Sequence, residues 1–257
     1  MNFLRVMQET TSWNLPILAL LLFVVFIYVG ICKKDTPFVH PILFCLSLLI
    51  LYVLIGSPYV SIVELSFSLH MIQMGLLYFI IPPLLIAGIP TYMYDKRSSS
   101  FGEKTFFIPI FMMYVFAVLL FFYHLPSIMN VLLPHPPMLL TYKAILFFLA
   151  CGMWWPIVTC RPRNQREKGR LTRYTSLCTL LITPSCLFFI VTAFIDSNSH
   201  AFFTQFSAHL CVPASHMHAL LPPFFQSKTD QWLAGLCMFT LHSCGVYLTN
   251  HLPKEQT

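Results

Sequence analysis

Long apolar stretches alternate with short polar ones along the whole chain. A helix of about 20 residues rises about 30 Å, the thickness of the hydrocarbon core of a bilayer. Seven stretches reach or approach that length, at about 15–32, 38–56, 68–90, 107–124, 138–160, 174–194 and 231–248. The pattern predicts an all-α protein: one polytopic membrane bundle of about seven transmembrane helices that occupies residues 1–257 and leaves nothing for a soluble domain.

The composition supports a membrane location. Hydrophobic residues make up 57% of the chain and charged residues only 9%, proportions that exclude a soluble domain with a wet surface. Eight of the nine cysteines fall within the apolar stretches or at their ends, and only Cys211 falls in an outer loop. We therefore expect packing thiols rather than a disulfide framework.

The basic residues predict the orientation of the bundle. The formal net charge is +6, but the charges are spread over alternate loops, so they do not form a face for nucleic acid. Lys and Arg follow the first, third, fifth and seventh stretches, while the opposite loops hold only Arg5 and Lys228. Positively charged loops face the cytoplasm. We expect a multi-pass protein of the cell membrane with its N-terminus outside and its C-terminus in the cytoplasm.

The stretch at 68–90 carries candidate chemistry at its outer end. His70, Gln73 and Met74 are spaced so that a helix presents them on one face. This face is suited to a soft metal ion, or it is simply a polar helix end at headgroup level. Pro82 and Pro83 remove two backbone donors in the middle of the same stretch and predict a kink.

Other polar residues are expected near the same membrane face. His124 ends the fourth stretch there, and Asp230 with Gln231 opens the seventh, either as a helix N-cap or as a partner that orients a histidine. The loop before Asp230 contains a compact run of possible copper ligands, His216, Met217 and His218.

Three further residues have ordinary expected roles. Lys143 is expected to extend its amine to the interface. Trp154 and Trp155 are expected to be interfacial anchors on the cytoplasmic side. No phosphate-binding glycine loop, catalytic triad, zinc-hydrolase motif or pair of carboxylates occurs in the chain, so we expect a protein that is not an enzyme.

Several short motifs together carry a resemblance to a known family. They are HMIQM and PPLLIAGIP at 70–90, FYHLP at 122–126, MWWPIV at 153–158, LITPSC at 181–186 and DQWLAG at 230–235. In this order they resemble the CtaG family of caa(3)-type cytochrome c oxidase assembly factors. The resemblance implies a plasma-membrane protein that is needed to form active haem–copper oxidase and that handles copper for it. The implied partners are the oxidase subunits and the lipid bilayer.

The chain departs from the family pattern at two places. Met74 stands where many members have a second histidine, and Lys143 stands where some have a histidine. A thioether in place of an imidazole favours Cu(I) over zinc or Cu(II).

The sequence thus predicts a low-coordination Cu(I) site formed by His70, Met74 and His124. Asp230 and Gln73 are expected to support these ligands, and the run from His216 to His218 is the alternative site. A second functional class stays open, a transporter or channel for a metal ion or small solute, because helices broken in mid-membrane are typical of substrate sites.

Overall fold

The computed structural model describes residues 13–33, 35–63, 66–93, 103–160, 162, 164–195 and 228–252. This part of the chain is helical, without a strand, and a helix lies at each of the seven predicted stretches. The elements are α2 (Leu15–Ile31), α3 (Val39–Gly56), α4 (Tyr59–Val63), α5 (Phe67–Gly75), η1 (Leu76–Ile80), α6 (Ile81–Ala87), η2 (Thr91–Met93), α7 (Glu103–Tyr123), α8 (Pro126–Leu132), α9 (Pro136–Thr159), α10 (Gln165–Ile195) and α13 (Lys228–His251).

Four helices of the described part are long and apolar enough to cross a membrane. They are Val39–Gly56, Phe67–Ala87, Pro136–Thr159 and Thr229–His251, and two shorter apolar helices cover Leu15–Ile31 and Phe107–Tyr123. The all-helical class is confirmed. The count of seven spans and the orientation of the two termini stay predictions.

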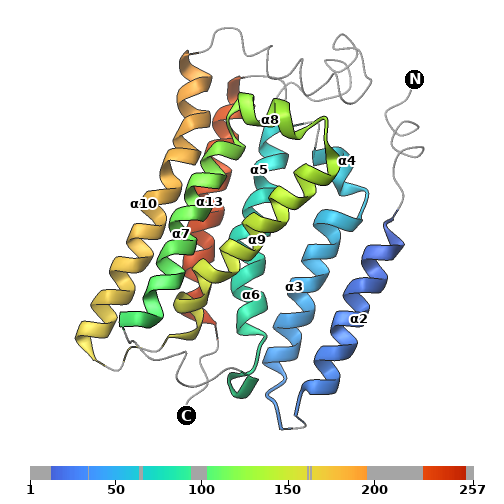
Figure 1. Ribbon diagram of the computed structural model, residues 1–257, viewed down its shortest axis with the longest axis vertical. Coiled ribbons are helices and arrows are strands. Elements are labelled where there is room, and N and C mark those ends of the chain that lie inside the picture. Colours follow the sequence, from blue (N-terminus) through green and yellow to red (C-terminus); the bar gives the residue numbers. More distant parts are fainter. Residues whose placement is uncertain are drawn as a thin grey trace.

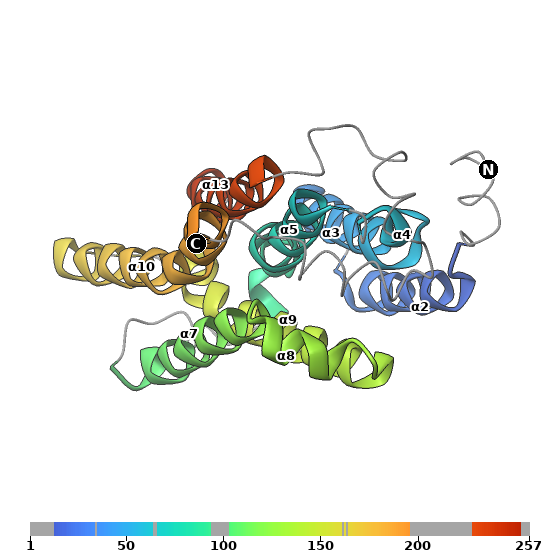
Figure 2. The ribbon, with the colours of Figure 1, turned by 90° about the horizontal axis from the view of Figure 1, so that it is seen from above.

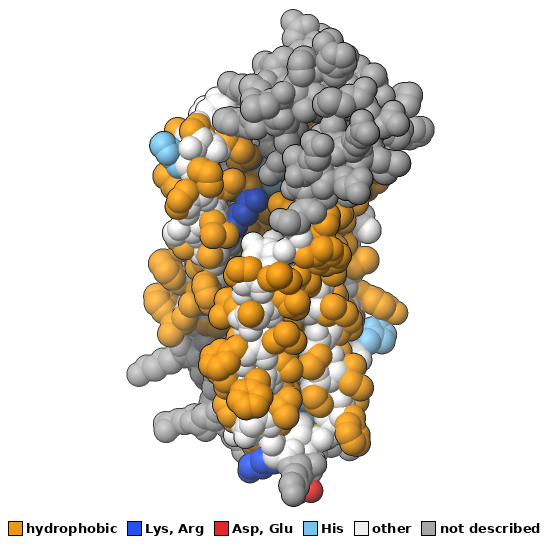
Figure 3. Space-filling model, turned by 90° about the vertical axis from the view of Figure 1, so that its right-hand side faces the viewer, with side chains coloured by type: hydrophobic (Ala, Val, Ile, Leu, Met, Phe, Trp, Pro, Cys, Tyr) orange, Lys and Arg blue, Asp and Glu red, His pale blue; other side chains and the backbone are white. Residues whose placement is uncertain are grey.

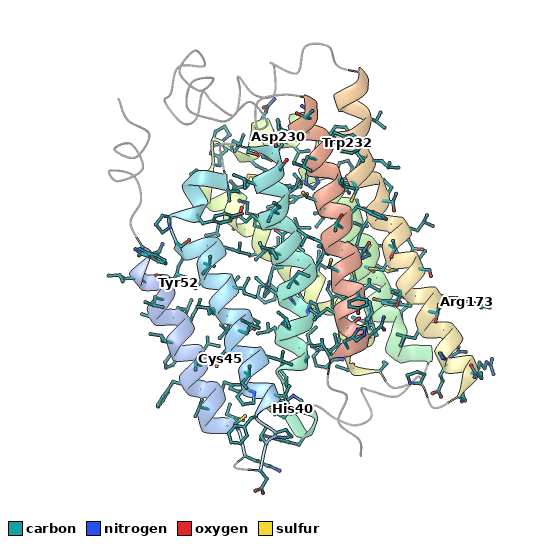
Figure 4. All side chains as sticks on the ribbon, turned by 180° about the vertical axis from the view of Figure 1, so that it is seen from behind. His40, Cys45, Tyr52, Arg173, Asp230 and Trp232 are labelled. Carbon is teal, nitrogen blue, oxygen red and sulfur yellow. The ribbon has the colours of Figure 1, made fainter. Side chains whose placement is uncertain are left out.

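Consecutive long helices run in opposite directions, so their ends gather at two poles of the bundle (Figure 1). Asp230 and Trp232 lie at one pole, whereas Arg173 and His40 lie toward the other (Figure 4). We call the pole with Asp230 the upper end. Both α5 and α13 begin there and α7 ends there, so the three segments with predicted site residues meet the same pole.

The segment α5–η1–α6 lies near the middle of the bundle, as the view along the helices shows (Figure 2). Its upper half packs on α13, and its lower half packs on α3 and α9. The main hydrophobic core surrounds this segment and includes Tyr78, Phe79 and Ile81, which are fully buried. The apolar stretch that carries the predicted site is therefore the central element of the fold.

The face of the bundle shown in Figure 3 is largely apolar over its described part, as expected for a lipid-facing bundle. On α2, Phe23 and Phe26 are 58% and 76% exposed. Large hydrophobic side chains exposed in this way mark an interaction surface rather than a surface in water.

The two prolines change the central helix without breaking it. A π-helical turn, η1, precedes Pro82 and Pro83, and the helix then continues as α6. Proline at i cannot donate to the carbonyl at i−4, so the carbonyl of Tyr78 loses its usual partner. The indole N–H of Trp154 donates to that carbonyl instead, at 2.9 Å. The structure thus has a π-helical turn where the sequence predicts a kink, and a neighbouring helix satisfies the freed backbone group as a membrane interior requires.

Trp154 corrects one prediction. It is 0% exposed and lies in the main core, so the expected interfacial anchor is wrong. The hydrogen bond to Tyr78 explains the burial, because a buried indole N–H requires an acceptor.

Candidate functional site

Asp230 closes the upper end of α5. Its carboxylate accepts hydrogen bonds from the backbone N–H of Phe67 at 2.8 Å and of Ser68 at 3.2 Å. The hydroxyls of Ser66 and Ser68 also donate to it. The third N–H of the helix, that of Leu69, points to the Ser66 hydroxyl at 3.4 Å.

This arrangement satisfies the amides that a helix N-terminus leaves without intrahelical partners. Asp230 is 0% exposed, and its negative charge lies at the positive end of the α5 dipole. The sequence suggested that Asp230 caps its own helix or orients a histidine. The structure shows that it caps α5, a helix more than 160 residues earlier in the chain, and so it fixes the start of the helix that carries His70.

His70 and His124 both contact the ring of Tyr123. The His70 ring stacks on Tyr123 with 6.0 Å between ring centroids, and its Nε2 lies 3.5 Å from the Tyr123 hydroxyl. The His124 ring meets Tyr123 edge to face at 5.4 Å. Tyr123 ends α7 and His124 follows it directly, so the contact that joins the two helices at the upper end is the one between His70 on α5 and Tyr123.

The hydrogen bond of His124 defines which nitrogen is able to bind a metal. Nδ1 lies 2.6 Å from the carbonyl oxygen of Leu120. A carbonyl only accepts, so Nδ1 carries the proton and the lone pair of the neutral ring is on Nε2. A backbone carbonyl that orients an imidazole in this way is the usual support of a histidine metal ligand.

Met74 and Gln73 lie deeper along α5. Met74 is 1% exposed and belongs to the main core, one turn from His70 on the same helix face. Gln73 donates from Nε2 to the carbonyl of Leu54 at 2.7 Å, which joins α5 to α3. The structure thus brings the two histidines to a common neighbour, places Met74 one turn below, and uses the Gln73 amide to hold the helix.

Lys143 lies near enough to His70 to act on it electrostatically, as does His124. A positive charge in this position opposes the binding of a cation. Any metal held by the two imidazoles would therefore be held less tightly than by the same ligands alone.

One predicted feature falls outside the described residues, the run from His216 to His218. Among the residues that the structure does describe, no group of three or more His, Cys, Asp or Glu side chains is arranged to hold a metal ion. A site at the upper end therefore requires the thioether or solvent as an additional ligand.

A comparison with protein families gives a match over most of the chain. Residues 29–248 match the model of the cytochrome c oxidase caa3 assembly factor family. No curated protein and no solved structure matched in the corresponding comparisons.

Proposed function

The chain belongs to the family of caa3 cytochrome c oxidase assembly factors, and from this membership we propose that it binds Cu(I) at its upper end and passes it to the oxidase. The observation that carries the proposal is the contact of His70 with Tyr123, the residue directly before His124, at the upper end of the bundle. The proposed role is assembly rather than catalysis. The proposed partners are the haem–copper oxidase subunits, within the cell membrane.

The chemistry of the donors supports copper in its reduced state. Imidazole and thioether are ligands that Cu(I) accepts in sites of two or three ligands. His70 and His124 supply the imidazoles, and Met74 supplies the thioether one turn below His70. Few ligands and the nearby charge of Lys143 both favour release, which a protein that transfers its ion requires.

Copper uptake by the purified protein tests the site. We expect the double substitution His70→Ala, Met74→Ala to remove one equivalent of Cu(I), and Lys143→Met to strengthen the binding of that equivalent. His135→Ala is the matched control, since His135 is an exposed histidine that precedes α9 near the same end. Unchanged stoichiometry in the double variant would refute the site, and the run from His216 to His218 would be examined next.

A transporter is the second candidate function. The π-helical turn at Leu76–Ile80 followed by two prolines supports it, because irregular helices near mid-membrane often form substrate sites. A deletion strain separates the two functions. Loss of oxidase activity with the subunits still made and other copper enzymes intact supports assembly, whereas a general change in cellular metal content supports transport.

The proposed topology has seven spans, with the N-terminus outside and the C-terminus in the cytoplasm. In this orientation the upper end faces the outer compartment. Reporter fusions at Ser99 and Asn198 are expected to lie on opposite sides of the membrane, with Ser99 inside. Two fusions on the same side would contradict the topology and, with it, an outer copper site.

A further inference from the structure

Three soft donor atoms from three different helices meet inside the core. The thiol sulfur of Cys178 on α10 lies 3.3 Å from the thioether sulfur of Met153 on α9. It also lies 3.7 Å from Nε2 of His242 on α13. Met153 and Cys178 are 0% exposed and His242 is 1% exposed. We call these three residues the sulfur–imidazole cluster.

The spacing of the cluster is close to that of atoms around one metal ion. Metal–sulfur bonds of about 2.3 Å and metal–nitrogen bonds of about 2.0 Å place two sulfur ligands of a trigonal site about 4.0 Å apart, and a sulfur and a nitrogen about 3.7 Å apart. The Cys178–His242 separation of 3.7 Å agrees with this geometry, whereas the Cys178–Met153 separation of 3.3 Å is about 0.7 Å shorter and requires the flexible Met153 side chain to move. Small side-chain shifts are enough to admit an ion.

Hydrophobic packing alone does not explain a histidine at this position. Nδ1 of His242 is buried and makes no hydrogen bond to any residue that the structure describes. The ring otherwise contacts Phe79, edge to face at 5.1 Å, and Trp154 at 6.0 Å. A buried polar atom without a partner destabilises the fold. A bond from Nε2 to a metal leaves the proton on Nδ1 and does not satisfy that atom; the stabilisation that keeps the ring in place then comes from the metal–nitrogen bond itself.

The charge of the cluster selects the ion. When a metal binds, the Cys178 thiol loses its proton, which leaves to solvent, and the sulfur–metal bond forms with no change in oxidation state. A monovalent cation with one thiolate, a neutral imidazole and a thioether has no net charge. A divalent cation would leave a positive charge in a low-dielectric interior, which is costly.

We propose that Met153, Cys178 and His242 form a buried site for one Cu(I) ion. This site is separate from the one at the upper end. Its ligands lie on α9, α10 and α13, whereas His70 and Met74 lie on α5 and His124 follows α7, so the two sites share no residue. The rings of Phe79 and Trp154 cover the imidazole, so the ion is shielded from water. The proposal does not depend on copper binding by His70, Met74 and His124.

The test uses the full-length protein in detergent, with Cu(I) supplied under anaerobic, reducing conditions. We expect Cys178→Ala to bind one equivalent fewer than the unmodified protein and to lose copper–sulfur scattering in the X-ray absorption spectrum. Met153→Leu keeps the packing volume and is expected to weaken that equivalent about tenfold or more. Cys186→Ala is the control, since Cys186 is a thiol on α10 that is only 2% exposed; it is expected to bind copper normally.

A stability measurement covers the case in which Cys178→Ala does not fold. At a free Cu(I) concentration of 100 times Kd, the unmodified protein is expected to gain about 5–11 °C in Tm, and Cys178→Ser is expected to lack that gain. Equal copper binding by the unmodified protein and Cys178→Ala, or no sulfur scattering in the unmodified protein, would overturn the proposal. The double variant His70→Ala, Met74→Ala is expected to keep the copper equivalent that the sulfur–imidazole cluster binds. This measurement distinguishes a failure of the buried site from a failure of the upper site.

Discussion

Replacing Asp230 by alanine is expected to destabilise the protein through the start of α5. The substitution removes the acceptor for four donors: the amides of Phe67 and Ser68 and the hydroxyls of Ser66 and Ser68. The two amides have no intrahelical partners, because they belong to the first turn of the helix. Asp230 is 0% exposed, so the donors that lose the carboxylate are left buried without an acceptor, which is costly.

The magnitude follows from the number of bonds. Hydrogen bonds between helices in a membrane protein contribute about 0.6 kcal/mol each on average and about 1.7 at most. Four donors to one charged acceptor then contribute about 3 kcal/mol, within the range that these values allow. In a protein of this size each kcal/mol corresponds to about 2–4 °C, so we expect Tm to fall by about 6–12 °C.

The assay is thermal unfolding in detergent, followed by the loss of helical circular dichroism. Asn164→Ala is the matched control, because Asn164 also caps a helix, accepting from the Glu167 amide at 2.9 Å, but lies exposed in polar sequence. We expect that control to lose about 1 kcal/mol or less. Asp230→Asn keeps one carbonyl acceptor and is expected to fall between the two. An Asp230→Ala variant as stable as Asn164→Ala would show that the carboxylate does not hold α5.

Two further predictions concern the irregular turn of the central helix. Trp154→Phe keeps the ring but removes the donor to the Tyr78 carbonyl, so we expect a loss of about 1–2 kcal/mol in the same unfolding assay; no loss would mean that water or another group satisfies the carbonyl. Gly245→Ala would place a Cβ 2.3 Å from the Phe79 carbonyl oxygen, and we expect about 1–3 kcal/mol of destabilisation. Gly169→Ala, whose Cβ would meet nothing within 4 Å, is expected to be neutral or slightly stabilising, and equal effects at the two glycines would refute the close contact.

The apolar pattern was sufficient to predict where the helices lie, because each membrane helix must satisfy its backbone internally and must cover itself with apolar side chains. It also predicted an irregularity at Pro82 and Pro83. It did not predict which partner satisfies the freed carbonyl, since that depends on how α9 is rotated against the central helix. For this reason the position of Trp154 near the end of its apolar stretch predicted a place at the membrane interface, whereas the side chain is buried in the core.

Polar residues show the same dependence on rotation. Asp230 lies at a helix start, and its sequence position suggested an ordinary N-cap; only the packing of α13 on α5 shows that the carboxylate serves the other helix. His70 and His124 were expected at one membrane face from helix direction alone; in the structure His70 contacts Tyr123, the residue directly before His124. The order of spans decides the depth of a residue, but not the direction in which it points.

The sulfur–imidazole cluster illustrates why depth alone is insufficient. Met153, Cys178 and His242 are each unremarkable in sequence, because a lone methionine, cysteine or histidine in an apolar stretch usually only packs. They lie on three helices that cross near the same depth, and Cys178 faces both of the other two. Since none of the three is within ligand spacing of another along the chain, a motif search has nothing to detect. If Cu(I) binds there, the protein has two proposed copper sites that share no ligand, one at the upper end and one inside the core between α9, α10 and α13.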